Sequence, residues 1–416
     1  MSKIGKRTAS SSVVRDLQIG KRAANSSVVR DLQIGKRTAN SSVVRDSQIG
    51  KRTGNSGGVR DLMMLDEIRE QPAALERSLR LGWRAAARLA RAIETRRPKL
   101  ILIAARGTSD NAAQFARYLL EITTGIPVSL AAPSIFTLYG AHVSLQDAMV
   151  VAISQSGEST DTNVVLDRAR KQGALTVGVT NQPRSTLANL AEHVFLVRAG
   201  RERSVAATKT YTGQLLMCYL MAHALGGRIH PDDLRRLPEW TEAALTLEPE
   251  IAGRAARYRF IERTIVVGRG LNYANASEFA LKLMETCYVA ADGFSAADFL
   301  HGPIAMIERS FPVFLFAPRG VTWPGLRDML RRLDSLQAET LVITDRGHRE
   351  AIASRANITP APIVIPAKFG PRALPQALYT PTPYIVPAQL FAAYLAKAKN
   401  LNPDRPRGLT KITRTL

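Results

Sequence analysis

Short apolar segments alternate with helical patterns along most of the chain after residue 65. Leu100-Ile-Leu-Ile-Ala104 is a continuous apolar run, the pattern expected of a strand that is buried on both faces. Similar runs cover residues 127–131, 149–153, 175–179, 194–197, 264–268, 313–316, 340–344 and 362–365. Helical stretches lie between most of these runs. Buried strands that alternate with helices predict an α/β protein with doubly wound parallel sheets.

The pattern indicates two similar α/β units in tandem. Thr264-Ile-Val-Val-Gly-Arg-Gly270 echoes the run at 100–107, although the two copies are offset by one residue. Helices are expected from Asp66 to about Arg97, over about 207–225 and over about 386–399. We therefore predict a first domain over residues 63–235, a second over 250–400 and a tail over 401–416, with a connection near 232–252.

The first 62 residues differ from the rest of the chain. Ile-Gly-Lys-Arg recurs at residues 4, 19, 34 and 49, which gives a tandem repeat of period 15. The repeats contain few apolar residues and no aromatic ones, so they cannot build a core. We expect a disordered tail, or an artefact of an early start codon with Met63 or Met64 as the true start. An organelle targeting segment fits less well, because each repeat also carries an Asp.

Composition narrows the classes of function. The 416 residues are 45% hydrophobic and 22% charged, and no apolar run is long enough to cross a bilayer. Two cysteines, Cys218 and Cys287, cannot form a disulfide framework, which favours a cytoplasmic protein. The net charge of +22 invites a nucleic-acid hypothesis, but no helix-turn-helix, zinc module or aromatic-basic stripe accompanies it. A basic body also suits an anionic substrate, so we expect neither nucleic-acid nor membrane binding.

One loop has the features of an anion site. Ser154-Gln-Ser-Gly-Glu-Ser-Thr-Asp-Thr162 lies between an apolar run and an amphipathic stretch that begins at Asn163. The free N–H groups and the dipole of a helix N-terminus favour negative charge. An ordinary N-cap at Ser159 or Thr160 is the simpler interpretation. Five of the nine residues carry hydroxyls, more than one cap needs, so a phosphate monoester is the expected ligand.

This loop resembles the sugar-phosphate loop of the sugar isomerase (SIS) domain family, and the resemblance is closest to the isomerase half of glucosamine-6-phosphate synthase. Related stand-alone glucosamine-6-phosphate deaminases belong to the same group. The resemblance covers roughly residues 64–416 and implies two SIS domains of flavodoxin-like fold. It also implies a set of sugar-phosphate contacts. The implied contacts are Ser109, Ser154, Gln155, Ser156, Ser159 and the backbone of Val205.

A second cluster carries ionisable groups. Glu278, Lys282 and Glu285 are spaced to share one helix face, and His301 precedes Gly-Pro in a loop. By themselves they are typical of a solvated Glu–Lys–Glu ladder and an incidental histidine. A carboxylate buried beside a lysine would instead have a tunable pKa. The apolar residues around the ladder leave room for this second interpretation.

The family resemblance implies roles for these residues. The residue matching Glu285 moves a proton between C1 and C2 of the sugar, with Lys282 and Glu278 supporting the charge. The residue matching His301 helps to open the sugar ring and usually reaches in from a neighbouring subunit, which implies a homodimer with shared sites. The C-terminal Pro-Arg-Gly-Leu-Thr-Lys411 resembles the family tail whose lysine contacts the open-chain carbonyl.

These residues form a chemically coherent set for aldose–ketose isomerisation without a metal or cofactor. Gly268-Arg-Gly270 lacks the further glycine of a dinucleotide fingerprint, and no metal-ligand cluster is visible. The synthase pattern is also broken at Arg106, where a small or thiol side chain is common, and at Ala207, Asp292 and Asp298. Both cysteines fall in apolar helical stretches, so glutamine hydrolysis by this chain is not expected.

The favoured hypothesis is an enzyme that converts glucosamine 6-phosphate into fructose 6-phosphate and ammonia. The close alternative is the synthetic direction, an isomerising fructose-6-phosphate aminotransferase that uses free ammonia or a separate glutaminase partner. A non-catalytic sugar-phosphate sensor is a hypothesis from another class. Glu285, His301 and Lys411 are all present, which favours catalysis over sensing.

Overall fold

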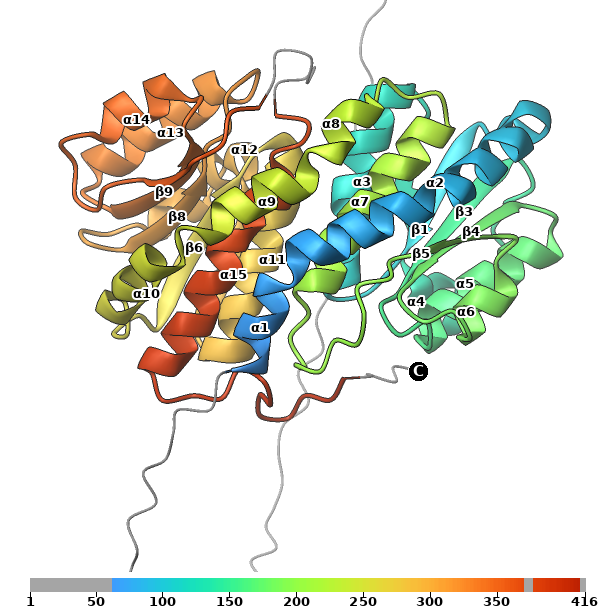
Figure 1. Ribbon diagram of the computed structural model, residues 1–416, viewed down its shortest axis with the longest axis horizontal. Helices are drawn as coiled ribbons and strands as arrows, with labels where there is room; N and C mark the ends of the chain where they lie inside the picture. The colour runs from blue at the N-terminus through green and yellow to red at the C-terminus, as the bar shows by residue number, and fades with distance from the viewer. Residues whose placement is uncertain (1–61, 370–376, 412–416) are drawn as a thin grey trace, which may run out of the picture. The chain divides into compact units, whose positions relative to one another are not determined.

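The computed structural model describes residues 62–369 and 377–411, which lie in one compact unit (Figure 1). The predicted N-terminal repeats therefore lie outside the described residues, apart from Leu62. The first half contains α1 (Met63–Arg69), α2 (Gln71–Arg96), β1 (Leu100–Ala104), α3 (Thr108–Thr124), β2 (Val128–Leu130), α4 (Pro133–Thr137), β3 (Ala148–Ile153), α5 (Thr160–Lys171), β4 (Leu175–Thr180), α6 (Thr186–Leu190), β5 (His193–Leu196) and α7 (Lys209–Ala224).

The connection and the second half follow. They contain α8 (Pro231–Arg235), α9 (Leu237–Leu245), α10 (Glu248–Arg257), β6 (Arg263–Gly268), η1 (Gly270–Asn272), α11 (Tyr273–Cys287), β7 (Ala290–Ser295), α12 (Ala296–Leu300), η2 (Pro303–Met306), β8 (Pro312–Phe316), α13 (Trp323–Ser335), β9 (Glu339–Asp345), α14 (Arg349–Arg355), β10 (Ile363–Ile365) and α15 (Pro381–Ala398). The predicted connection near 232–252 is therefore mostly helical, and the division into two domains at 235–250 stays a prediction.

Two five-stranded parallel sheets confirm the predicted fold class. The first sheet has the order β2-β1-β3-β4-β5 and the second has the order β10-β9-β8-β6-β7. Counted within each half, both orders are 2-1-3-4-5, the doubly wound arrangement that binds ligands at the carboxyl ends of its strands. The shared order supports the tandem relation that the sequence echo suggested.

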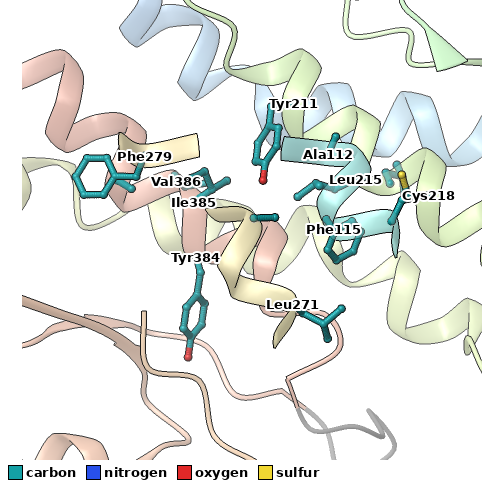
Figure 2. Close-up of a cluster of buried hydrophobic side chains, with 14 of the residues drawn as sticks. Ala112, Phe115, Tyr211, Leu215, Cys218, Leu271, Phe279, Tyr384, Ile385 and Val386 are labelled. Carbon is teal, nitrogen blue, oxygen red and sulfur yellow. The ribbon is translucent and has the colours of Figure 1, made fainter. Parts of the chain in front are cut away.

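Four central helices, α3, α7, α11 and α15, pack between the two sheets (Figure 1). Helix α3 contacts β1, β2 and β3 of the first sheet, α11 contacts β6, β7 and β8 of the second, and the two helices also contact each other. Helices α7 and α15 pack against this pair. Figure 2 shows Phe115, Tyr211 and Leu215 from this region beside Phe279 and Ile385, all of them buried. One continuous core therefore joins both halves and holds α3 and α11 in a fixed relation.

Strand β7 was not predicted, because its sequence does not read as a strand. Residues Ala290–Ser295 include Asp292 and Gly293, yet all six pair in parallel with β6 at the edge of the second sheet. A Cβ atom built on Gly293 would lie 2.6 Å from the Cα of Ser277 in α11. The glycine therefore permits the close packing of helix on strand.

The remaining differences are small. Helix α15 begins at Pro381, five residues before the predicted start, and contains Pro387. The predicted strands and the long helices near 66–97 and 207–225 appear with boundaries shifted by a few residues. Within the described residues, no helix is both long enough and apolar enough to cross a bilayer.

Candidate active site

The hydroxyl-rich loop connects the central strand β3 to the N-terminus of α5. The hydroxyl of Ser154 accepts a hydrogen bond from the N–H of Gly157 at 3.1 Å, and that of Ser156 accepts from the N–H of Glu158 at 3.2 Å. Gly157 has a φ of 68°, a conformation that favours glycine. Its carbonyl accepts a hydrogen bond from the side chain of Asn163 at 3.1 Å. The loop is thus folded by its own polar groups.

Ser159 occupies the N-cap position of α5 but makes no side-chain cap hydrogen bond. The simpler interpretation of Ser159 as a capping side chain is therefore wrong for this structure. An α-helix leaves its first N–H groups without intrahelical partners, and here the cap side chain does not satisfy them. The N-terminus of α5 therefore begins directly after the hydroxyl-rich loop without a side-chain cap from Ser159.

A cavity of about 350 Å³ opens at this loop. It brings together the carboxyl ends of β1 and β3, the segment after β5, helix α11 and the C-terminal tail. Its lining residues are Arg106, Gly107, Thr108, Ser109, Ser154, Gln155, Ser156, Ser159, Val205, Ala207, Glu285, Leu409, Thr410 and Lys411. All six predicted sugar-phosphate contacts therefore lie around one cavity, together with Glu285 and Lys411.

Three of the predicted catalytic residues form a buried ionic cluster on α11. The Nζ of Lys282 lies 3.5 Å from Glu278, contacts the carboxylate of Glu285 and donates to the hydroxyl of Thr108 at 3.2 Å. Glu278 and Lys282 are fully buried, whereas the side chain of Glu285 is 23% exposed and faces the cavity. A fully solvated ladder is therefore wrong as a description of this cluster.

Helix α3, which packs against the first sheet, contributes two hydrogen-bond donors to this cluster on α11. Glu278 accepts hydrogen bonds from the Thr108 hydroxyl at 3.1 Å and from the Asn111 amide at 2.8 Å. Burial raises the pKa of Glu278 to about 7, although Lys282 and these two donors oppose the rise. Burial lowers the pKa of Lys282, but its two carboxylate neighbours outweigh burial and raise it. Lys282 therefore remains a cation beside Glu285.

Sequence reasoning missed Glu202 in the segment after β5. Its carboxylate is buried and accepts hydrogen bonds from the N–H groups of Thr208 and Thr210 at 2.9 and 3.1 Å. Lys411 donates to Glu202 at 3.0 Å and to the carbonyl of Ser204 at 2.5 Å. Burial alone would raise the pKa of Glu202, but Lys411 and the hydrogen bonds together lower it. Glu202 thus holds the C-terminal lysine at the cavity.

Arg106, which departs from the synthase pattern, also lines the cavity. Its guanidinium makes an ion pair with Asp161 in the first turn of α5, with an Nη2–Oδ2 distance of 2.8 Å. Asp161 is nearly buried and Arg106 is half-exposed, and their pair joins the turn after β1 to the first turn of α5, next to the hydroxyl-rich loop. The sequence identified Arg106 as unusual but could not name its partner.

His301 is not brought to this cavity. It is an exposed residue that follows α12 in a turn, and its N–H donates to the carbonyl of Asp298. The expectation that it acts in the site of a neighbouring copy stays a prediction. Within residues 62–369 and 377–411, no cluster of His, Cys, Asp or Glu side chains is arranged to hold a metal ion.

Comparison with known proteins places the chain in a family. The SIS domain model matches residues 95–224 and 260–365, more than half of the chain. Glutamine–fructose-6-phosphate aminotransferase (isomerizing) from Pyrococcus horikoshii is 34% identical over 354 residues. That alignment covers 84% of this chain but only 57% of the relative, so the chain spans little more than half the length of this curated relative.

Two solved structures are similar over nearly their whole length. The C-terminal domain of glucosamine-fructose-6-phosphate aminotransferase from Francisella tularensis aligns with a TM-score of 0.73 and 27% identity, over 83% of this chain and 98% of that domain. A presumed phosphosugar isomerase from Silicibacter pomeroyi aligns with a TM-score of 0.71 and 31% identity, over 82% of this chain and 100% of that protein. The chain belongs to the SIS domain family.

Proposed function

We propose that the chain is an aldose–ketose isomerase that deaminates an amino-sugar phosphate, converting glucosamine 6-phosphate and water into fructose 6-phosphate and ammonia. The observation that carries this proposal is that the Glu285 carboxylate faces the same cavity as the hydroxyl-rich loop. A phosphate held by Ser154, Ser156 and Ser159 would leave the sugar within a space that also contains a carboxylate base and the Lys411 ammonium.

The chemistry follows from these groups. In the open-chain aldehyde, Glu285 removes the proton from C2 and delivers it to C1, while a proton passes from the amino nitrogen to the oxygen on C1. C1 then carries a hydroxyl group and C2 an imine. Water then adds to the imine carbon and ammonia departs, so that C2 becomes the ketone. Lys411, beside the carbonyl end, stabilises the charge that develops on oxygen. Lys282 contacts the carboxylate of Glu285, and Glu278 holds Lys282 in place.

The names of the relatives favour a second candidate, the same reaction in the synthetic direction. The Pyrococcus relative is named an isomerising aminotransferase. In that direction ammonia attacks the C2 ketone of fructose 6-phosphate and water leaves, which forms an imine at C2. Glu285 then moves a proton from C1 to C2 while a proton passes from the oxygen on C1 to the nitrogen, which gives the amino aldehyde. Ammonia would come from solution or from a glutaminase partner.

The test uses the full chain with glucosamine 6-phosphate and no glutamine, and measures ammonia and fructose 6-phosphate together. Equal amounts of both products support deamination, and unphosphorylated glucosamine should not turn over at the same concentration. Turnover of fructose 6-phosphate plus ammonium in the reverse assay alone would favour the synthetic candidate. Saturable binding of both sugars without turnover in either assay would refute the enzyme proposal and favour a sensor.

A further inference from the structure

A second, larger cavity adjoins the candidate active site. Its volume is about 780 Å³, and it shares Gln155, Ser156, Val205 and Lys411 with the sugar cavity. It is formed by the turns after β4 and β5 and by the C-terminal tail. The remaining lining residues are Met63, Glu158, Gln182, Pro183, Arg184, Ser185, Arg201, Glu202, Arg203, Asp404 and Arg405. We name it the arginine cavity after Arg184, Arg201, Arg203 and Arg405.

The four arginines are exposed and keep their donors available. Among residues 62–369 and 377–411, none of these four guanidinium groups makes a hydrogen bond or an ion pair with another residue. Some other arginines of the described residues do pair with acids, as Arg69 does with Glu248. A cluster of unpaired guanidinium groups around a hollow presents many charge-assisted donors to one ligand.

The carboxylates of the arginine cavity are already engaged. Glu202 accepts hydrogen bonds from Lys411 and from Thr210. Asp404 accepts hydrogen bonds from the N–H groups of Met63 and Met64 at 3.0 and 2.8 Å. Glu158 accepts hydrogen bonds from the N–H and hydroxyl of Thr186 at 3.0 and 2.8 Å. These three acids therefore have partners other than the four arginines.

We propose that the arginine cavity binds a small polyanion, with two or more phosphate or carboxylate groups, while the sugar phosphate occupies its own cavity. The volume falls within the range of about 300–1,000 Å³ that is typical of small-molecule sites. Planar guanidinium groups match the geometry of phosphate and carboxylate oxygens. A single hexose phosphate held at the hydroxyl-rich loop leaves this adjoining space unfilled.

Isothermal titration calorimetry with inorganic pyrophosphate tests the proposal. The full chain is first saturated with fructose 6-phosphate and is then titrated with pyrophosphate. We expect one saturable site per chain, whose affinity falls at least about tenfold in Arg201→Gln/Arg203→Gln, since hydrogen bonds to charged groups are individually strong. The control Arg80→Gln/Arg84→Gln removes the same charge from the exposed face of α2 and should change the affinity less than about twofold.

Each other outcome overturns the proposal in a distinct way. If fructose 6-phosphate abolishes pyrophosphate binding, pyrophosphate binds at the hydroxyl-rich loop and not in the arginine cavity. If both double variants weaken binding equally, the attraction is general surface charge. If pyrophosphate fails to bind but polyglutamate binds through Arg201 and Arg203, the cavity is a docking surface for an acidic protein. The initial titration with fructose 6-phosphate separately shows whether the proposed sugar-phosphate site binds its ligand.

Discussion

Replacing the buried lysine of the α11 cluster should destabilise the protein strongly. Lys282 is fully buried and contacts Glu278, Glu285 and Thr108. In Lys282→Met the apolar side chain fills a similar volume, but Glu278 is left as a buried carboxylate without its cation. Removing one partner of a buried ion pair costs about 3–5 kcal/mol.

The pH dependence of this loss follows from the pKa of Glu278. The pKa of Glu278 is about 7 in the native protein, against 4.5 for an ordinary glutamate. Between pH 4.5 and pH 7, Glu278 is therefore protonated in the folded state but ionised in the unfolded state. A group of this kind stabilises the fold at low pH and loses that contribution as pH rises through the folded pKa. Without Lys282 the folded pKa rises further, so the penalty should be larger at pH 8 than at pH 6.

Urea denaturation, followed by circular dichroism at both pH values, measures the effect. The double variant Lys282→Met/Glu278→Gln removes the stranded charge and should recover at least about 1 kcal/mol of the apparent free energy of unfolding. Lys171→Met is the matched control, because Lys171 pairs with Asp167 at an exposed site and should contribute less than about 1 kcal/mol. A loss in Lys282→Met no greater than in the control would refute the reasoning.

Three further predictions concern the hydroxyl-rich loop, Glu202 and the β7 edge. Ser156→Ala should raise the KM for glucosamine 6-phosphate about 5- to 15-fold, as expected for one lost hydrogen bond to a charged phosphate, with circular dichroism unchanged. The pKa of Glu202 is lowered in the folded state, so the stability that this carboxylate contributes is present above its unfolded pKa and is lost as pH falls. The unfolding free energy of Glu202→Gln should therefore depend less on pH in the acid range than that of the native protein. Gly293→Ala should lower the melting temperature by several degrees, because the new Cβ would meet the backbone at Ser277.

Hydrophobic periodicity predicted most of the fold, because fully buried parallel strands leave an apolar signature. β1 and β3 are continuous apolar runs, and they were located within a residue or two. β7 was missed since an edge strand can contain Asp292 and Gly293, and only the packing of α11 explains its glycine. The early start of α15 was missed because proline normally ends a helical pattern.

The candidate site was predicted unevenly, according to whether a residue's role depends on local pattern. The hydroxyl-rich loop could be predicted because the strand, turn and helix signals lie in one short stretch of sequence. Glu202 lies in an Arg-Glu-Arg segment, a pattern typical of a solvent-exposed loop. The carboxylate is buried against Lys411, which is more than two hundred residues away in the sequence. The arginine cavity likewise joins Arg184, Arg201 and Arg405 through tertiary contacts that no local spacing reveals.

Turnover by Glu285→Gln tests the proposed proton transfer most directly. The variant keeps the size of the side chain but removes the base, while the hydroxyl-rich loop that would hold the phosphate is unchanged. We predict that it binds fructose 6-phosphate within about threefold of the native affinity and that kcat for glucosamine 6-phosphate falls at least about 10²-fold. The matched variant Glu242→Gln, at an exposed position on α9, should retain full activity. Native turnover by Glu285→Gln would contradict the assignment of Glu285 as the base.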